Sequence, residues 1–227
     1  MKAPIRRLTK KEIVWLSEHY CRHSHTYLDH YNCFLAEQPE DCPFVEQVGF
    51  LDIETTSLHG DTGYITSYAI KERDGDVLGR VLNPAEIKNH TFDRKLVEEC
   101  FTDMKKFHRL VVYYGGDYRF DIPFLRTRAV YYELEFPLYK DVYLQDAYSV
   151  IKSKFNFQRR SLWKVCQLFD ISEKGGHWIT PQIQHRAMTG DPEALEIIWK
   201  HNVEDVIATE KLWNKIEGYV LRSKRSI

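Results

Sequence analysis

The sequence contains no run of about 18 apolar residues, which excludes a helix that could span a membrane. The charged residues near the amino terminus are not followed by the apolar stretch of a secretory signal. The five cysteines are scattered and odd in number, which argues against a framework of disulfides. These absences predict a cytoplasmic protein in a reducing environment.

Neither sign of charge is in excess, since the chain has 32 Lys and Arg against 33 Asp and Glu and a net charge of -1. This balance excludes a protein that attracts nucleic acid through its overall field, so any such contact would need a local basic patch. Internal repeats and low-complexity segments are absent as well. With 227 residues, of which 43% are hydrophobic, the chain can bury the core of one full domain.

We expect three parts along the chain. Residues 1–43 form a helical appendage rich in histidine and cysteine, residues 44–220 form the main domain, and residues 221–227 form a basic tail. Within the appendage, Thr9 and Glu12 have the spacing of a capping box, which predicts a helix that begins there.

The appendage offers one candidate metal site. Two cysteines and two histidines are close enough in sequence to ligate zinc tetrahedrally: Cys21, His25, His30 and Cys33. Their spacing matches no standard zinc finger. The alternative is an appendage that docks through its aromatic residues and needs no metal, with the histidines on a polar surface. We expect this metal-free alternative.

In the main domain, the apolar pattern predicts three strands with short connections, over residues 48–57, 64–71 and 77–82. Short connections require antiparallel neighbours. Further along the chain helical and strand-like segments alternate, and Asp191 and Pro192 begin a long helix. The sequence therefore predicts an α/β fold in which a mixed sheet, first antiparallel and then parallel, is flanked by helices.

The first strand ends in two acids, within the sequence VGFLDIETTS. Asp52 and Glu54 are two residues apart, so a strand places both carboxylates on one face. Two acids at the end of a buried strand repel each other and resist the loss of water, and a divalent metal ion with oxygen ligands would stabilise them. The alternative is a pair of solvated acids at the start of a loop.

Later segments carry further acids. Asp121 follows a Gly-Gly turn and lies between apolar residues, where it could ligate a metal or cap the next helix. His201 and Asp205 are four residues apart, so a helix places them on one face, as part of a metal site or as a surface ion pair. Asp146 ends a short strand, and we expect it to cap the following helix.

Together these segments resemble a known family. DIETT at residues 52–56, FDIPFL at residues 120–125 and HNVEDV at residues 201–206 are similar to the three exonuclease motifs of the DEDD (DnaQ-like) 3′-5′ exonuclease superfamily. The third motif is most similar to the YprB-type ribonuclease-H-like branch. The resemblance covers about residues 46–217 and leaves the appendage outside. It implies a ribonuclease-H-like fold.

The resemblance also implies a metal-dependent nuclease that hydrolyses phosphodiester bonds from a 3′ end with two Mg²⁺ or Mn²⁺ ions. It implies that Asp52 bridges both ions. Glu54 and Asp205 would hold the ion on the side of the nucleophile, and Asp121 would hold the other ion, largely through water.

The match departs from the family at the general base. The best-known relatives carry a tyrosine four residues, or a histidine five residues, before the last aspartate. Here His201 is four residues before Asp205, and Lys200 is five residues before it. His201 would orient or deprotonate the attacking water, or would only neutralise Asp205.

A basic segment with interleaved aromatic residues, KSKFNFQRRSLWK, is the best candidate for contact with phosphate groups. Its cations are Lys152, Lys154, Arg159, Arg160 and Lys164. The alternative is a solvated pair of helices whose aromatic residues pack in the core. We expect a nucleic-acid substrate, DNA or RNA, with a single-stranded 3′ end. A non-cleaving nucleic-acid-binding module and an endonuclease or resolvase of the same fold are the alternatives.

Overall fold

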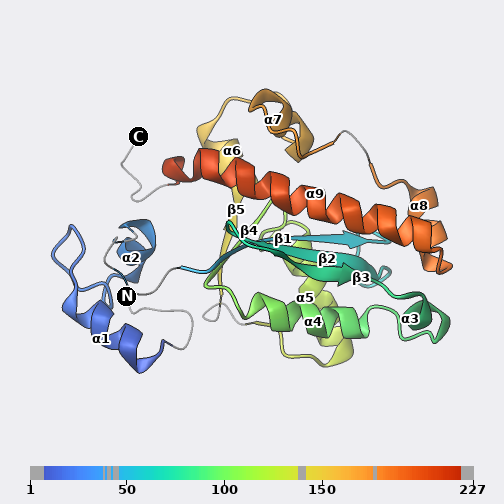
Figure 1. The fold of residues 1–227 in the computed structure, drawn as a ribbon, viewed down its shortest axis with the longest axis horizontal. Coiled ribbons are helices and arrows are strands. Elements are labelled where there is room, and N and C mark those ends of the chain that lie inside the picture. The colour runs from blue at the N-terminus through green and yellow to red at the C-terminus, as the bar shows by residue number, and fades with distance from the viewer. Residues whose placement is uncertain are drawn as a thin grey trace.

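The computed structural model describes residues 8–37, 39, 42, 46–137, 142–175 and 178–220, so the expected basic tail lies outside the described residues. The described chain is built on a five-stranded sheet in the order β3-β2-β1-β4-β5 (Figure 1). The strands are β1 (Val48–Thr55), β2 (Ile65–Glu72), β3 (Val77–Val81), β4 (Arg109–Val112) and β5 (Tyr143–Asp146). The β1–β2 and β2–β3 pairs are antiparallel, whereas the β1–β4 and β4–β5 pairs are parallel. The expected mixed sheet is confirmed.

Helices cover both faces of this sheet. In the main domain they are α3 (Pro84–Lys88), α4 (Arg94–Met104), α5 (Asp121–Tyr132), α6 (Ala147–Lys154), α7 (Leu162–Leu168), α8 (Pro181–Met188), α9 (Pro192–Ile216) and the 3-10 helix η1 (Glu217–Tyr219). The long helix α9 crosses one face and packs on β1, β2 and β3, while α4 packs on β2 and β3 from the opposite face (Figure 1).

Strand β1 separates two hydrophobic cores. Leu51 and Ile53 belong to the core that includes residues of α4, α5 and the first turns of α9, and Phe50 belongs to the core that includes the second half of α9, from Val206 onward. Because successive side chains of a strand point to opposite faces, Asp52 and Glu54 continue the row of Phe50 and lie on the α9 side. The alternation of β1 thus directs both acids toward the long helix.

Helix α9 begins where the sequence predicts. The Asp191 side chain accepts hydrogen bonds from the backbone N–H groups of Glu193 and Ala194, and Pro192 occupies the first turn, where its missing N–H is not needed. The helix runs for 25 residues. Its middle lies against β1, where Asn202 contacts Asp52, and its last turns share a core with Val48 at the beginning of β1.

The appendage folds as a small unit, which we call the N-terminal unit (residues 8–37). Its helices α1 (Lys10–Glu18) and α2 (Tyr31–Glu37) lie near the beginning of β1 (Figure 1). The expected capping box is present, with Thr9 and Glu12 exchanging hydrogen bonds. The unit has its own small core, formed by Leu16, Cys21, Tyr27, Tyr31, Cys33 and Phe34. Such a core contributes little apolar burial.

Three short helices, α2, α3 and α8, have too few turns to show a helical repeat, and the sequence pattern does not predict them. Among the described residues, no helix is both long enough and apolar enough to cross a membrane.

Candidate carboxylate site

Acids from three separate segments meet beside α9. Asp52 and Glu54 come from β1, Asp121 comes from the first turn of α5, and Asp205 comes from α9. The charge of Asp121 interacts with those of the other three. The structure therefore brings together the four carboxylates that the sequence pattern singles out.

Burial raises the pKa of each carboxyl group in this cluster, and repulsion by neighbouring acids adds to the rise at Asp52, Glu54 and Asp121. Loss of hydration is the largest cause for Asp52, and the charge of Asp205 adds to it, so that the pKa of Asp52 rises to about 8. The same causes place the pKa values of Glu54 and Asp121 well above their ordinary values. Burial also raises the pKa of Asp205. The raised pKa values mean that ionisation of these carboxyl groups is unfavourable, and a bound cation would stabilise the ionised form.

Asp52 is held in place by Asn202 of α9. The Asn202 amide nitrogen donates a hydrogen bond of 2.7 Å to Asp52 Oδ2, and its oxygen accepts one of 2.7 Å from the Ser67 hydroxyl on β2. Asn202 and Ser67 are fully buried. The chain Ser67–Asn202–Asp52 therefore links two neighbouring strands to the helix and orients the carboxylate.

Asp121 occupies a buried position that leaves one of its oxygens without a partner. Its side chain is only 3% exposed, and Oδ2 has no hydrogen-bond donor among the described residues. Phe120 holds the N-cap position of α5, so the expected alternative that Asp121 caps this helix is wrong. A Cβ atom on Gly115 would collide with the Asp121 carboxylate, which explains why a residue without a side chain stands there.

His201 lies between two of the acids. Its Nε2 atom is 3.6 Å from Glu54 Oε1 and 4.0 Å from Asp205 Oδ2. The side chain is largely buried. The imidazole is therefore beside the carboxylates rather than on the outer surface of α9, which contradicts the alternative of a surface ion pair.

The sequence pattern misses one residue of the site, Lys174. It comes from the loop between α7 and α8, and its ammonium forms an ion pair with Asp205 and lies 3.3 Å from His201 Nε2. Its side chain is 8% exposed. The charge of Lys174 opposes the rise in the pKa of Asp52, Glu54 and Asp205. The Lys174 ammonium therefore supplies part of the positive charge that the acids require.

The residues present fit a divalent cation with oxygen ligands. Mg²⁺ and Mn²⁺ prefer carboxylate oxygens, and the cluster supplies four carboxyl groups. Asp121 Oδ2 is a buried acceptor that has no donor among the described residues, and the Lys174 ammonium shows that the cluster accommodates a positive charge. The groups that could hold a metal are those of Asp52, Glu54, Asp121 and Asp205.

Two further acids near the site have structural partners. Asp146 caps α6 as expected, because its Oδ1 accepts a hydrogen bond of 2.9 Å from the backbone of Tyr148. It also forms an ion pair of 2.9 Å with Arg119. Asp117, in the same turn as Asp121, pairs with Arg126 at 2.6 Å. The Asp146 carboxylate is nonetheless close enough for its charge to raise the pKa of Asp121.

The basic segment KSKFNFQRRSLWK spans the end of α6 and the start of α7. Its aromatic residues Phe155 and Phe157 pack against Phe169 at the edge of the core beneath α9, as the alternative for this segment expects. Of its cations, Lys152 and Arg159 are exposed, whereas Lys154, Arg160 and Lys164 are partly buried. The segment therefore offers exposed positive charge without an exposed stacking surface from its phenylalanines.

The candidate zinc ligands of the N-terminal unit need one correction, since His25 is not among the side chains that converge. The converging set is Cys21, His23, His30 and Cys33. The chain turns at Ser24, whose φ is 62°, and the His25 carbonyl oxygen accepts a hydrogen bond of 2.9 Å from the Cys21 N–H. The His25 ring packs edge-on against the His30 ring, with 5.1 Å between centroids.

With this geometry established, comparisons place the chain among known proteins. A family model described as RNase_H superfamily matches residues 49–217. A comparison with curated proteins gives no significant match. The fold is similar to that of the family B DNA polymerase from the hyperthermophilic archaeon Pyrobaculum calidifontis, with a TM-score of 0.60 and 18% sequence identity. The likeness covers 79% of this chain and 25% of the polymerase chain, and it concerns the fold.

Proposed function

The chain belongs to the ribonuclease H superfamily, and from that premise we propose that it is a metal-dependent nuclease that hydrolyses phosphodiester bonds, in particular a 3′-5′ exonuclease of the DEDD type. The expected ribonuclease-H-like fold is confirmed by the family match over residues 49–217. The observation that carries the proposal is the convergence of four carboxylates, largely removed from water, from β1, α5 and α9. The sequence of the third motif, in which Asn202 follows His201, is the feature that favours the YprB-type branch.

The four carboxylates, from Asp52, Glu54, Asp121 and Asp205, would hold two Mg²⁺ or Mn²⁺ ions in this function. When bound, such ions polarise the phosphodiester and lower the pKa of the attacking water. The cluster suits this role because its own repulsion disfavours the metal-free charged state, as the raised pKa values show.

The chain's own groups act by position and by proton transfer. Asn202 fixes the Asp52 carboxylate, and Gly115 leaves room for that of Asp121. His201 Nε2 lies 3.6 Å from Glu54, where it can take a proton from a water molecule held beside that carboxylate. The water oxygen then bonds to phosphorus, the bond from phosphorus to the 3′ oxygen breaks, and that oxygen takes a proton from solvent water. The product is a nucleoside 5′-monophosphate.

The location of the acids favours a nuclease over a module that only binds nucleic acid. In a module that only bound nucleic acid, these carboxylates would repel the phosphate backbone unless cations neutralised their charge. Asp121 has an oxygen without a donor among the described residues, which is destabilising unless a ligand satisfies it. An endonuclease of the same fold would use the same acids, so the substrate tests below separate the two activities.

A digestion panel tests the proposal. Single- and double-stranded DNA and RNA labelled at the 5′ end are incubated with the protein and Mg²⁺ or Mn²⁺, beside the Asp52→Asn variant. We expect a ladder that shortens from the 3′ end, released mononucleotides and no products from the variant. Cleavage of a closed circular substrate would instead identify an endonuclease. Retained binding without any cleavage would contradict the proposal and favour a binding module.

A further inference from the structure

The N-terminal unit holds a cluster of metal-ligating side chains apart from the carboxylates. Cys21 and His23 lie in a hairpin loop that the Tyr20–Thr26 bridge closes. His30 comes directly before α2, and Cys33 lies in its first turn. Although the sequence pattern favours a unit without metal, we propose that these four side chains, Cys21, His23, His30 and Cys33, bind one structural Zn²⁺ ion. The proposal does not rest on the nuclease function.

The distances between the ligand atoms match a tetrahedral zinc site. Zn–S bonds of about 2.3 Å and Zn–N bonds of about 2.0 Å place sulfur and nitrogen about 3.5 Å apart on a tetrahedron. Cys21 Sγ lies 3.9 Å from His23 Nδ1 and 3.6 Å from His30 Nδ1. Cys33 Sγ lies 3.2 Å from His23 Nδ1 and 3.4 Å from His30 Nδ1. All four ligand atoms lie within 4.8 Å of one another.

The backbone prepares this arrangement. The Cys21 N–H donates to the His25 carbonyl at 2.9 Å, and the Ser24 N–H donates to the Cys21 carbonyl at 2.9 Å, which makes a tight loop around His23. At the second pair, the Cys33 N–H donates to the His30 carbonyl at 2.8 Å. The hairpin loop and the start of α2 therefore each aim one thiol and one imidazole at the same point.

The ligand set identifies both the metal and its role. Two thiolates and two imidazoles in a tetrahedron suit Zn²⁺, whereas Mg²⁺ requires oxygen ligands. Binding would convert the thiols of Cys21 and Cys33 to thiolates and release their protons. Because four protein ligands fill a tetrahedral site, no position is left for substrate or water, and the ion is structural. The small core of this unit is where such an ion contributes most to stability.

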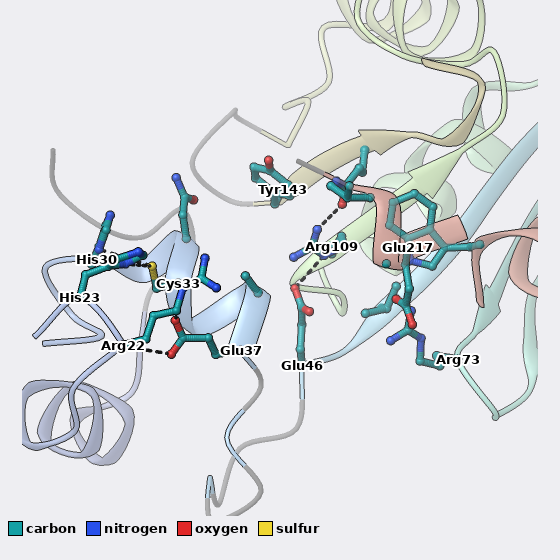
Figure 2. A pocket seen from close by; sticks show the side chains of 17 residues that line it. Arg22, His23, His30, Cys33, Glu37, Glu46, Arg73, Arg109, Tyr143 and Glu217 are labelled. Atoms are coloured by element: carbon teal, nitrogen blue, oxygen red, sulfur yellow. Dashed lines mark hydrogen bonds and ion pairs between the residues drawn. The ribbon is translucent and has the colours of Figure 1, made fainter. Parts of the chain in front are cut away.

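The site lies at the opposite end of β1 from the carboxylates. His23, His30 and Cys33 line one wall of a cavity of about 510 Å³, and the facing wall includes residues at the beginnings of β1, β4 and β5, among them Val48, Arg109 and Tyr143 (Figure 2). The carboxylates of β1 lie toward the end of that strand. The zinc would therefore fix the shape of the N-terminal unit, including its side of this cavity, without entering the carboxylate cluster.

Zinc content measured on the full chain tests this inference. The protein is expressed and purified without added zinc, and metal per chain is determined by elemental analysis. We expect one zinc per chain, loss to background in His23→Ala and Cys33→Ser, and retention in the matched controls His25→Ala and Cys42→Ser. Asp52→Asn should also retain the zinc, because it alters only the carboxylate site.

A measurement on the unaltered chain keeps the inference testable if a ligand variant fails to fold. Zinc is exchanged for Co²⁺, and the absorption spectrum is recorded. Tetrahedral ligand-field bands with thiolate-to-metal charge transfer would support the site. A spectrum typical only of octahedral oxygen ligands, the absence of zinc from the purified protein, or a Cys21–Cys33 disulfide found by mass spectrometry would each overturn it. Zinc lost in His25→Ala but retained in His23→Ala would overturn the ligand assignment.

Discussion

Asn202 on α9 donates a hydrogen bond of 2.7 Å to Asp52 on β1, although 150 residues separate the two in the chain. Asn202 is fully buried and also accepts a hydrogen bond from Ser67, so both ends of its amide are used. A single side chain thus connects the packing of the long helix to the orientation of a central acid. Stability and activity should respond together when it is altered.

We expect Asn202→Ala to lower stability by about 1–3 kcal/mol, because it removes the hydrogen bond that Asp52 accepts and the shorter of the two hydrogen bonds of the buried Ser67 hydroxyl. Activity should fall as well, since Asp52 loses its orienting donor. Chemical unfolding and digestion rates check the two effects. Asn214→Ala, at an exposed position of the same helix, is the matched control and should change neither. A variant with unchanged cleavage would show that Asn202 serves packing alone.

Asp52→Asn should abolish cleavage and leave the metal-free protein as stable as the parent, or more stable, because it removes one carboxylate from a cluster whose charges repel one another. Digestion with Mg²⁺ and thermal melting in chelator measure the two properties. Asp117→Asn, which breaks only the pair with Arg126 at 2.6 Å, should retain cleavage. A large loss of stability in Asp52→Asn would assign the acid a structural role.

His201→Ala should lower the cleavage rate by about 10²–10⁴-fold if the imidazole takes the proton from water. His185→Ala removes an exposed histidine on α8 and serves as the control. Rates at saturating substrate distinguish loss of chemistry from loss of binding. Activity within severalfold of the parent would limit His201 to balancing the charge of its neighbours Glu54 and Asp205.

Lys174→Met should reduce the concentration of Mg²⁺ needed for half-maximal activity, because the ammonium that competes with metal at Asp205 is gone. The same variant should destabilise the metal-free protein, whose acids lose their compensating charge. Lys211→Met, which breaks an ion pair with Glu173, is the control. If Lys174→Met instead weakens substrate binding without a change in metal requirement, the lysine contacts the phosphate of the substrate.

The stability of the metal-free protein should fall as pH rises from about 5 to about 8. Folding raises the pKa of Asp52 from 3.8 to about 8, so the folded chain binds more protons than the unfolded chain in this window. The favourable contribution of the protonated group is complete below the unfolded pKa and is lost as pH approaches the folded one. Melting temperatures in chelator should therefore decrease with pH, and less steeply in Asp52→Asn. Parallel slopes would contradict the raised pKa.

The parts of the site that follow local rules are predictable from sequence. The strand alternation that pairs Asp52 with Glu54 and the helical spacing of His201 and Asp205 depend on a few neighbouring residues. Lys174 does not follow such a rule, since the path of the loop that carries it depends on where α7 and α8 pack. The only sequence signal near Lys174 is the Gly-Gly pair that follows it.

The zinc ligands of the N-terminal unit illustrate the same limit. The sequence pattern identifies three of the four, but the choice between His23 and His25 depends on the left-handed turn at Ser24, whose φ is 62°. Serine has no strong preference for the left-handed conformation, so the presence of a serine does not predict this turn. The hairpin geometry, rather than the spacing of the ligands, decides which imidazole turns inward.

The wide separation of the acids along the chain also affects when the site can form during protein synthesis. Asp52 and Glu54 leave the ribosome long before Asp205, and the hydrogen bond that orients Asp52 needs a helix residue 150 positions later. Long-range contacts of this kind form late in folding, because the intervening chain must first be closed into a loop. A nascent chain therefore contains no complete carboxylate cluster, and any cleavage activity begins only after α9 has docked on the sheet.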